Sequence, residues 1–219
     1  MIEFVKRVPL FSQLNEEQLQ TVAQMCTKRT YKAGTVLFSE KDPGSVFYIV
    51  YSGSVKIYTA SSTGEEKILS ICKASESFGE LSLIDGKPRS ASAQTLEESV
   101  LITLTERNFL DMLRSHFDIT LGIMRELSRR LRETNQEVFD LTFLDARTRV
   151  IKSLIKLANK HGVRNSNQIT IKLVLNFDEI SQLAGVPKTT LMQVIRDLEE
   201  KGILALTPSD FRLDLANLR

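Results

Sequence analysis

Short strand-like runs separated by glycines fill the first half of the chain after an amphipathic opening. The first twenty residues carry apolar positions at helical spacing, and Pro9 and the stretch Asn15-Glu16-Glu17-Gln18 introduce a short helix. From about residue 29, β-rich runs follow at residues 35–38, 46–50, 54–58, 67–71, 91–93 and 100–104, with glycines in or beside the connections. This pattern is typical of a compact antiparallel barrel or roll.

The pattern becomes helical after Thr105 and stays helical through about Leu141, with Gly122 as a weak interruption. Two series recur every seventh residue in this segment: Phe117, Met124, Leu131 and Val138, and three places on, Thr120, Leu127, Thr134 and Leu141. Such a seam is typical of a coiled coil. Because the helix is longer than a small barrel, we expect it to pair with a second copy; the alternative is that the stripe packs only on its own barrel.

The last third of the chain predicts a winged helix-turn-helix. An amphipathic helix over 146–160 leads through a polar turn, 161–167, to a strand over 169–175. Two short helices then flank Gly185, with inner faces filled by Ile180, Leu183, Ala184, Leu191, Val194, Ile195 and Leu198. Two short strands, 203–206 and 211–215, surround the turn Pro208-Ser209-Asp210 and form a wing. The alternative is an unrelated α+β module with two crossed helices.

The predicted fold class is therefore α+β, with a roll domain over 1–108, a dimerisation helix and hinge over 109–145, and a winged helix-turn-helix over 146–219. No apolar run reaches the length of a membrane span, and no secretory signal opens the chain, so a cytoplasmic location without a membrane partner is expected. Two cysteines without a C-x-x-C pair, and two histidines, do not make an iron–sulfur or zinc site, so no metal is expected.

The net charge of +2 is divided unevenly. Residues 147–219 carry 12 Lys and Arg against 7 Asp and Glu, a balance of +5, while residues 1–146 carry 17 against 20, a balance of −3. A polyanion would therefore bind the C-terminal third.

The segment from Phe78 to Ala93 has the residues that a phosphorylated sugar needs. Gly79 would let the backbone approach a ligand, and Glu80 would accept from a sugar hydroxyl. Arg89 would bind the phosphate and Ser90 would add a hydroxyl or amide donor, while a single helical turn after Glu80 would supply further N–H groups. The alternative is that Glu80 and Arg89 merely pair with one another across a hairpin.

Gly79-Glu80-Leu81 followed by Arg89-Ser90-Ala91, within a glycine-punctuated roll, resembles the cyclic-nucleotide-binding domain. With the long helix and the terminal helix-turn-helix, nearly the whole chain is similar to the cAMP receptor protein/FNR (CRP/FNR) family of bacterial regulators. The resemblance implies nucleotide contacts by Gly79, Glu80, Leu81, Arg89 and Ser90, and adenine contacts by Thr134 and Asn135 on the long helix.

Several positions depart from the family pattern. Asn135 stands where the best-known member has serine, and an amide can both donate and accept a hydrogen bond. Ser75-Glu76 replaces a frequent Gly-Asp before the Phe-Gly-Glu triplet. The cysteine clusters of oxygen-sensing members and the paired histidines of haem sensors are absent, which disfavours those branches.

The resemblance also implies that the second helix of the helix-turn-helix enters the major groove. Lys188 would read guanine or bind phosphate, Gln193 would pair with adenine, and Thr189 would contact a thymine methyl or a phosphate. Thr190 and Arg196 would contact phosphates. Arg-Glu and a later Arg on this face in the best-known members are replaced here, so the half-site sequence cannot be carried over.

The sequence thus predicts a cAMP-responsive, homodimeric, sequence-specific DNA-binding transcriptional regulator, with RNA polymerase as a further partner that the resemblance implies. Ligand binding would reposition the DNA-binding domains allosterically. The alternative is a regulator of the same family that is ligand-independent or takes another ligand, with a vestigial pocket. A third possibility, a regulatory subunit of another protein, is opposed by the helix-turn-helix. Without a nucleophile triad, a P-loop or metal ligands, no enzyme is predicted.

Overall fold

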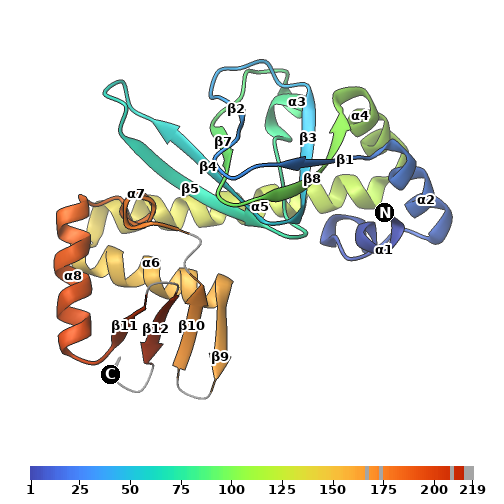
Figure 1. Ribbon diagram of the computed structural model, residues 1–219. Coiled ribbons are helices and arrows are strands. Elements are labelled where there is room, and N and C mark those ends of the chain that lie inside the picture. The colour runs from blue at the N-terminus through green and yellow to red at the C-terminus, as the bar shows by residue number, and fades with distance from the viewer. Residues whose placement is uncertain (166–167, 173–174, 208–209, 215–219) are drawn as a thin grey trace. The chain divides into compact units, whose positions relative to one another are not determined.

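The computed structural model describes residues 1–165, 168–172, 175–207 and 210–214 (Figure 1). The chain divides into two compact units, Met1–Thr134 and Asn135–Arg219. Helix α5 (Phe117–Phe143) runs from the first unit into the second. The domain boundaries predicted from the sequence, after residues 108 and 145, stay predictions.

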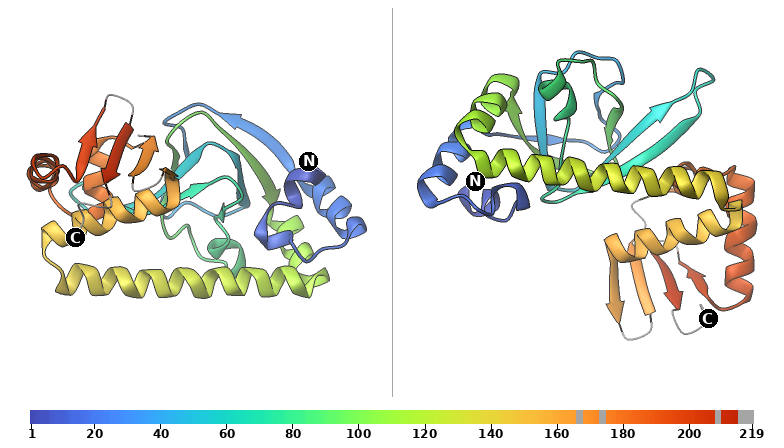
Figure 2. Two further views of the ribbon diagram at one scale, coloured as in Figure 1. Left: turned by 90° about the horizontal axis from the view of Figure 1, so that it is seen from below. Right: turned by 180° about the vertical axis from the view of Figure 1, so that it is seen from behind.

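Short helices open the first unit: α1 (Ile2–Val5), η1 (Pro9–Phe11) and α2 (Glu16–Met25). The predicted opening helix is therefore present. Asn15 caps α2, because its side chain accepts from the Gln18 amide while the Gln18 side chain accepts from the Asn15 amide. Together with α4 (Glu106–Ser115), these helices gather at one end of the roll (Figure 2).

Two four-stranded antiparallel sheets form the roll, in the orders β1-β8-β3-β6 and β2-β7-β4-β5. Their bounds are β1 (Thr27–Tyr31), β2 (Val36–Phe38), β3 (Val46–Ser52), β4 (Ser54–Ala60), β5 (Glu66–Lys73), β6 (Ser77–Phe78), β7 (Ser92–Thr95) and β8 (Ser99–Thr105). The six predicted runs all overlap strands. The sequence did not predict β1, whose residues are mostly exposed and polar, or β6, which has only two residues.

The single helix expected after Thr105 is two helices. The chain leaves helical geometry at His116, with φ −132° and ψ 95°, between α4 and α5. This break lets Phe109 of α4 and Ile119 of α5 both pack into the core at the end of the roll. Gly122 does not interrupt α5; a Cβ there would lie 3.0 Å from Leu10 Cδ1, so its role is close packing.

The second unit contains the predicted winged helix-turn-helix. Its elements are α6 (Ala146–His161), β9 (Gly162–Asn165), β10 (Gln168–Lys172), α7 (Phe177–Ala184), α8 (Lys188–Glu200), β11 (Leu204–Leu206) and β12 (Asp210–Asp214), with sheet order β11-β12-β10-β9. Strand β9 replaces part of the predicted polar turn. The turn residues Pro208 and Ser209, residues 173–174 of the predicted strand over 169–175, and residue 215 of the predicted strand over 211–215 lie outside the described residues.

Most of the predicted inner faces of α7 and α8 are buried. Ile180, Ala184, Leu191, Val194, Ile195 and Leu198 are buried, and Leu183 is half-buried. Gly185 ends α7 in the left-handed conformation, with φ +63°, which a side chain would strain. Arg149 of α6 donates to the Gly185 carbonyl at 3.1 Å and to the Leu144 carbonyl at 2.9 Å, and so fixes the turn between the two helices.

Candidate nucleotide pocket and DNA-reading helix

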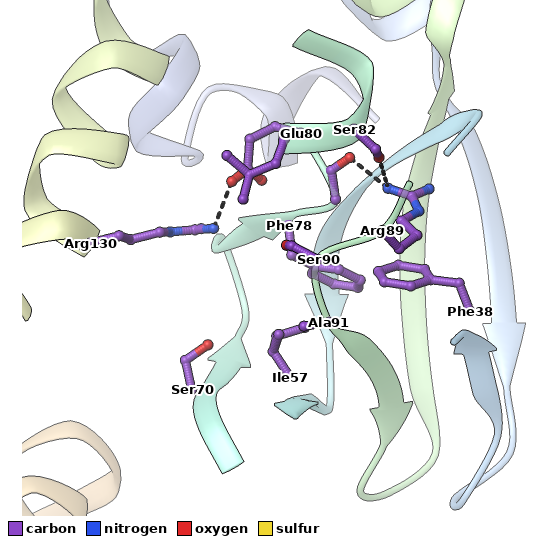
Figure 3. A pocket seen from close by; sticks show the side chains of 12 residues that line it. Phe38, Ile57, Ser70, Phe78, Glu80, Ser82, Arg89, Ser90, Ala91 and Arg130 are labelled. Carbon is purple, nitrogen blue, oxygen red and sulfur yellow. Dashed lines mark hydrogen bonds and ion pairs between the residues drawn. The ribbon is translucent and has the colours of Figure 1, made fainter. Parts of the chain in front are cut away.

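The predicted roll contacts line one pocket (Figure 3). Gly79 follows β6, and Glu80 precedes the short helix α3 (Leu81–Asp85), which is the single helical turn that the sequence predicted. The pocket also contains Leu81, Arg89 and Ser90, while Arg130 reaches it from α5. The structure thus brings together Gly79, Glu80, Leu81, Arg89 and Ser90.

The Arg89 side chain is a buried cation, with only 5% of the residue exposed. Nη1 donates to the Gly79 carbonyl at 2.6 Å and to Ser82 Oγ at 3.0 Å, and Nη2 donates to the Val46 carbonyl at 2.7 Å. All three acceptors are neutral, and Nε is buried without a hydrogen-bond partner. Among the described residues Arg89 forms no ion pair, and burial lowers its pKa. An anion would offset this desolvation and satisfy Nε.

Glu80 pairs with Arg130 and not with Arg89, so the hairpin pair considered as an alternative is not formed. Arg130 Nη1 lies 3.0 Å from Glu80 Oε1. The second carboxylate oxygen, Oε2, is buried without a partner in a residue that is 4% exposed. A buried, unpartnered carboxylate oxygen is an acceptor for a ligand hydroxyl.

The sequence prediction missed Arg130 and the acid that holds it. Glu126 Oε1 accepts from Arg130 Nε at 2.8 Å and from Arg129 Nη2 at 2.7 Å. Hydrogen bonds from Arg129 and then Arg130 lower the pKa of Glu126 to about 2, although burial opposes them. The Glu126–Arg130 spacing of four residues is a helical pair that the sequence could have revealed, whereas the contact with Glu80 joins segments fifty residues apart.

Two glycines leave room for this arrangement. Gly79 has φ +85°, and a Cβ there would lie 2.8 Å from Arg89 Nη1. Gly44, before β3, was not singled out from the sequence as a site residue. A Cβ at Gly44 would lie 2.0 Å from Ser82 Oγ and 3.5 Å from Arg89 Cζ. Because Gly44 has no side chain, Ser82 can lie against the Arg89 guanidinium.

We expect Gly44→Ala to displace Ser82 and Arg89 and to weaken cyclic-nucleotide binding about tenfold, because overpacking a buried site costs about 1–3 kcal/mol. Calorimetric titration with cAMP measures this effect. The double variant Gly44→Ala/Ser82→Gly removes the overlapping atoms and should recover part of the affinity. Ser45→Ala, at the exposed neighbouring residue, is the control. Equal affinities of Gly44→Ala and the wild type would contradict the role of this close packing.

The two predicted adenine contacts do not line the pocket of the single chain. Thr134 and Asn135 are both exposed on α5. On the same helix the first heptad series is unpartnered, with Phe117 74%, Met124 57%, Leu131 62% and Val138 58% exposed.

The second heptad series differs from the prediction in its first half. Leu127 packs against the core at the end of the roll, and Thr120 Oγ1 donates to the Leu113 carbonyl at 2.7 Å. These two side chains therefore turn toward their own unit. The reason is that α5 must cover the roll with one face, and the neighbouring Ile119 and Ile123 are buried there.

The predicted DNA contacts share the outer side of α8. Lys188, Thr189, Gln193 and Arg196 are exposed, and Thr190 is half-exposed. Lys188 forms an ion pair with Asp178 of α7, at 2.8 Å. No local pattern in the sequence indicates this pair, because its members lie ten residues apart on different helices.

No group of three or more potential His, Cys, Asp or Glu metal ligands occurs among the residues that the structure describes. Within the same residues, no helix is both long and apolar enough to cross a membrane. Neither Cys26 nor Cys72 forms a disulfide bond, and burial raises the pKa of Cys26 to about 12.

The fold and pocket define a class of protein in which a ligand-binding roll is followed by a long helix and a winged helix-turn-helix. Residues 28–116 match the model of the cyclic nucleotide-binding domain. The chain is 31% identical over 206 residues to a CRP-like cAMP-activated global transcriptional regulator of Mycobacterium tuberculosis, covering 94% of this chain and 92% of the relative. It is 33% identical over 204 residues to the cyclic AMP receptor protein of Thermus thermophilus, covering 93% and 91%.

A solved structure shares the fold: the c-di-GMP-responsive global regulator CLP of Xanthomonas campestris, with a TM-score of 0.79 at 22% identity over 91% of this chain and 99% of that chain. The chain belongs to the CRP/FNR family of transcriptional regulators. It is a DNA-binding regulator and not an enzyme, as the sequence predicted.

Proposed function

We propose that the protein is a homodimeric, sequence-specific transcriptional regulator whose effector is cAMP. The observation that carries this proposal is a pair of unsatisfied polar atoms in one pocket. Arg89 Nε is a buried donor without an acceptor, and Glu80 Oε2 is a buried acceptor without a donor. A cyclic nucleotide offers the two matching groups, an anionic phosphate and a ribose 2′-hydroxyl.

The remaining pocket residues suit the same ligand. A guanidinium has five N–H groups, and three hydrogen bonds anchor Arg89 to the roll, so Nε and one Nη2 hydrogen are left for a phosphate. Ser90 is exposed beside this site and can add a donor. Gly79, without a side chain, and Leu81, at the start of α3, complete the contacts that we assign to the ligand.

The choice of base would depend on α5. Thr134 and Asn135 follow Arg130 by one helical turn, and an Asn amide can both donate and accept. The Mycobacterium relative is described as cAMP-activated and the Thermus relative as a cyclic AMP receptor protein, whereas CLP is described as c-di-GMP-responsive. The nucleotide must therefore be identified by a direct comparison.

Arg130 connects the ligand pocket to helix α5, through which ligand binding could act on the DNA-binding unit. It joins Glu80 of the pocket to α5, and α5 continues into the second unit. A ligand that binds more tightly to one arrangement of the paired α5 helices would favour that arrangement. The two helix-turn-helix motifs of a dimer would then match half-sites about one DNA turn apart. Such a regulator would act in the cytoplasm, with RNA polymerase as a further partner.

Titrating cAMP, cGMP, c-di-GMP or buffer into the full chain, while following binding to a randomised DNA pool, tests the proposal. We expect cAMP to bind and to increase selection of one sequence with two-fold symmetry. Equal DNA binding with and without each nucleotide would contradict the proposal that a nucleotide controls DNA binding, and would indicate a vestigial pocket. A DNA-binding response only to another nucleotide would contradict the assignment of cAMP as the effector.

Two substitutions on α8 separate base reading from phosphate contact. Gln193→Ala should relax the preference at one base pair, because a bidentate amide contact contributes about 1–3 kcal/mol of discrimination. Arg196→Ala should weaken binding to all sequences and reduce the salt slope by about 0.9. Selection from random sites and titrations at several salt concentrations measure the two effects. An unchanged base preference in Gln193→Ala would contradict the assignment of Gln193 as a base contact.

A further inference from the structure

An ion pair joins the two helices of the helix-turn-helix at the predicted DNA-reading surface. Lys188 Nζ, at the first residue of α8, lies 2.8 Å from Asp178 Oδ2 in the first turn of α7. Both side chains are more than half exposed, at 52% for Lys188 and 59% for Asp178. An acidic side chain beside a cation is unexpected where a protein must meet a polyanion.

Lys188 occupies a position that disfavours a cation. The N-terminus of a helix carries a partial positive charge, the first turn of α8 has no acidic residue, and Pro187 provides no side-chain cap. The ammonium therefore gains from a nearby anion. In the free protein, Asp178 supplies that anion.

We propose that Asp178 is a specificity-determining residue that directs Lys188 to a base edge and away from the DNA backbone. This inference rests on the proposed function of α8. A lysine ammonium has three donors, so Lys188 can keep its bond to Asp178 and still donate to the O6 and N7 acceptors of a guanine. On other DNA, leaving Asp178 for a phosphate would only exchange one anion for another.

Phosphate contacts carry no sequence information, whereas base contacts do. If Asp178 keeps Lys188 from phosphates, non-operator DNA loses one electrostatic contact and the operator keeps a base contact. The carboxylate thus increases the ratio of operator to non-operator affinity. Without it, a long flexible lysine would bind whichever phosphate lay within reach.

The experiment compares the full-length wild type with Asp178→Asn, at saturating cAMP. The probes are the duplex recovered from a randomised pool and a mixed-sequence duplex without that site. We expect Asp178→Asn to bind the mixed-sequence duplex about fivefold more tightly, with a salt slope steeper by about 0.9, because one more phosphate is contacted. Affinity for the selected duplex should change less than about twofold, and a second selection should show relaxed preference at one base pair.

Two further variants make the test specific. Glu200→Gln removes the same charge at the other end of α8 and should leave both affinities unchanged. In a Lys188→Ala background, Asp178→Asn should have no effect, because Asp178 acts through Lys188. An unaltered salt slope in Asp178→Asn, an equal gain in Glu200→Gln, or a persistent gain in the Lys188→Ala background would overturn the inference. A wild type that binds neither duplex would instead overturn the proposed function.

Discussion

Replacing Arg89 with alanine is expected to weaken cAMP binding by at least about 100-fold. Hydrogen bonds to charged groups contribute about 1.5–3 kcal/mol each, and the phosphate would lose two of them together with its counter-charge. Calorimetric titration of the purified full chain measures the change. The DNA-binding response to cAMP should be lost in parallel.

Controls separate this effect from damage to the roll, because Arg89 also anchors the Gly79 and Val46 carbonyls. Arg89→Lys keeps the charge but not the planar fork, so we expect an intermediate affinity. Arg107→Ala removes an exposed arginine of α4 and should bind cAMP normally. Thermal unfolding identifies variants that have lost the fold. A folded Arg89→Ala variant with wild-type affinity would refute the phosphate assignment.

Leu131→Glu is expected to convert the proposed dimer into monomers and to weaken operator binding strongly. Leu131 is 62% exposed in the single chain, so the charge does not disturb the fold of the monomer. In a two-fold symmetric pair of α5 helices, the substitution would place two carboxylates in an apolar seam. Because burying unpaired charges costs several kcal/mol, we expect dimer dissociation to increase by about 1000-fold. Light scattering after size exclusion measures the mass.

Two variants control for the nature and place of this change. Leu131→Met keeps an apolar side chain of similar volume and should remain dimeric. Val163→Glu introduces the same charge at an apolar residue of β9 that is 72% exposed, and should also remain dimeric. A dimeric Leu131→Glu protein would show that copies associate through another surface, and a monomeric wild type would end the proposal of a homodimer.

Local patterns predicted most elements of the fold. β-rich runs between glycines predicted β3, β4 and β8, helical periodicity predicted α6 to α8, and Gly185 marked the turn between the last two helices. The edge strand β1 has no such apolar run, because its residues are mostly exposed, and β6 is too short for a pattern. No glycine or proline beside His116 indicates the break between α4 and α5. The break follows from the packing of both helices on the roll.

The sequence by itself determined the order of the domains, the candidate ligand contacts in the segment from Gly79 to Ser90 and the class of protein. These features depend on residues that lie close together in the chain. Tertiary structure decided which partners the charged groups take. Glu80 meets Arg130, Gly44 makes room for Ser82, and Asp178 meets Lys188. The physical reason is that each contact joins different elements, and hydrophobic periodicity records which face of an element is buried but not which side chain faces it.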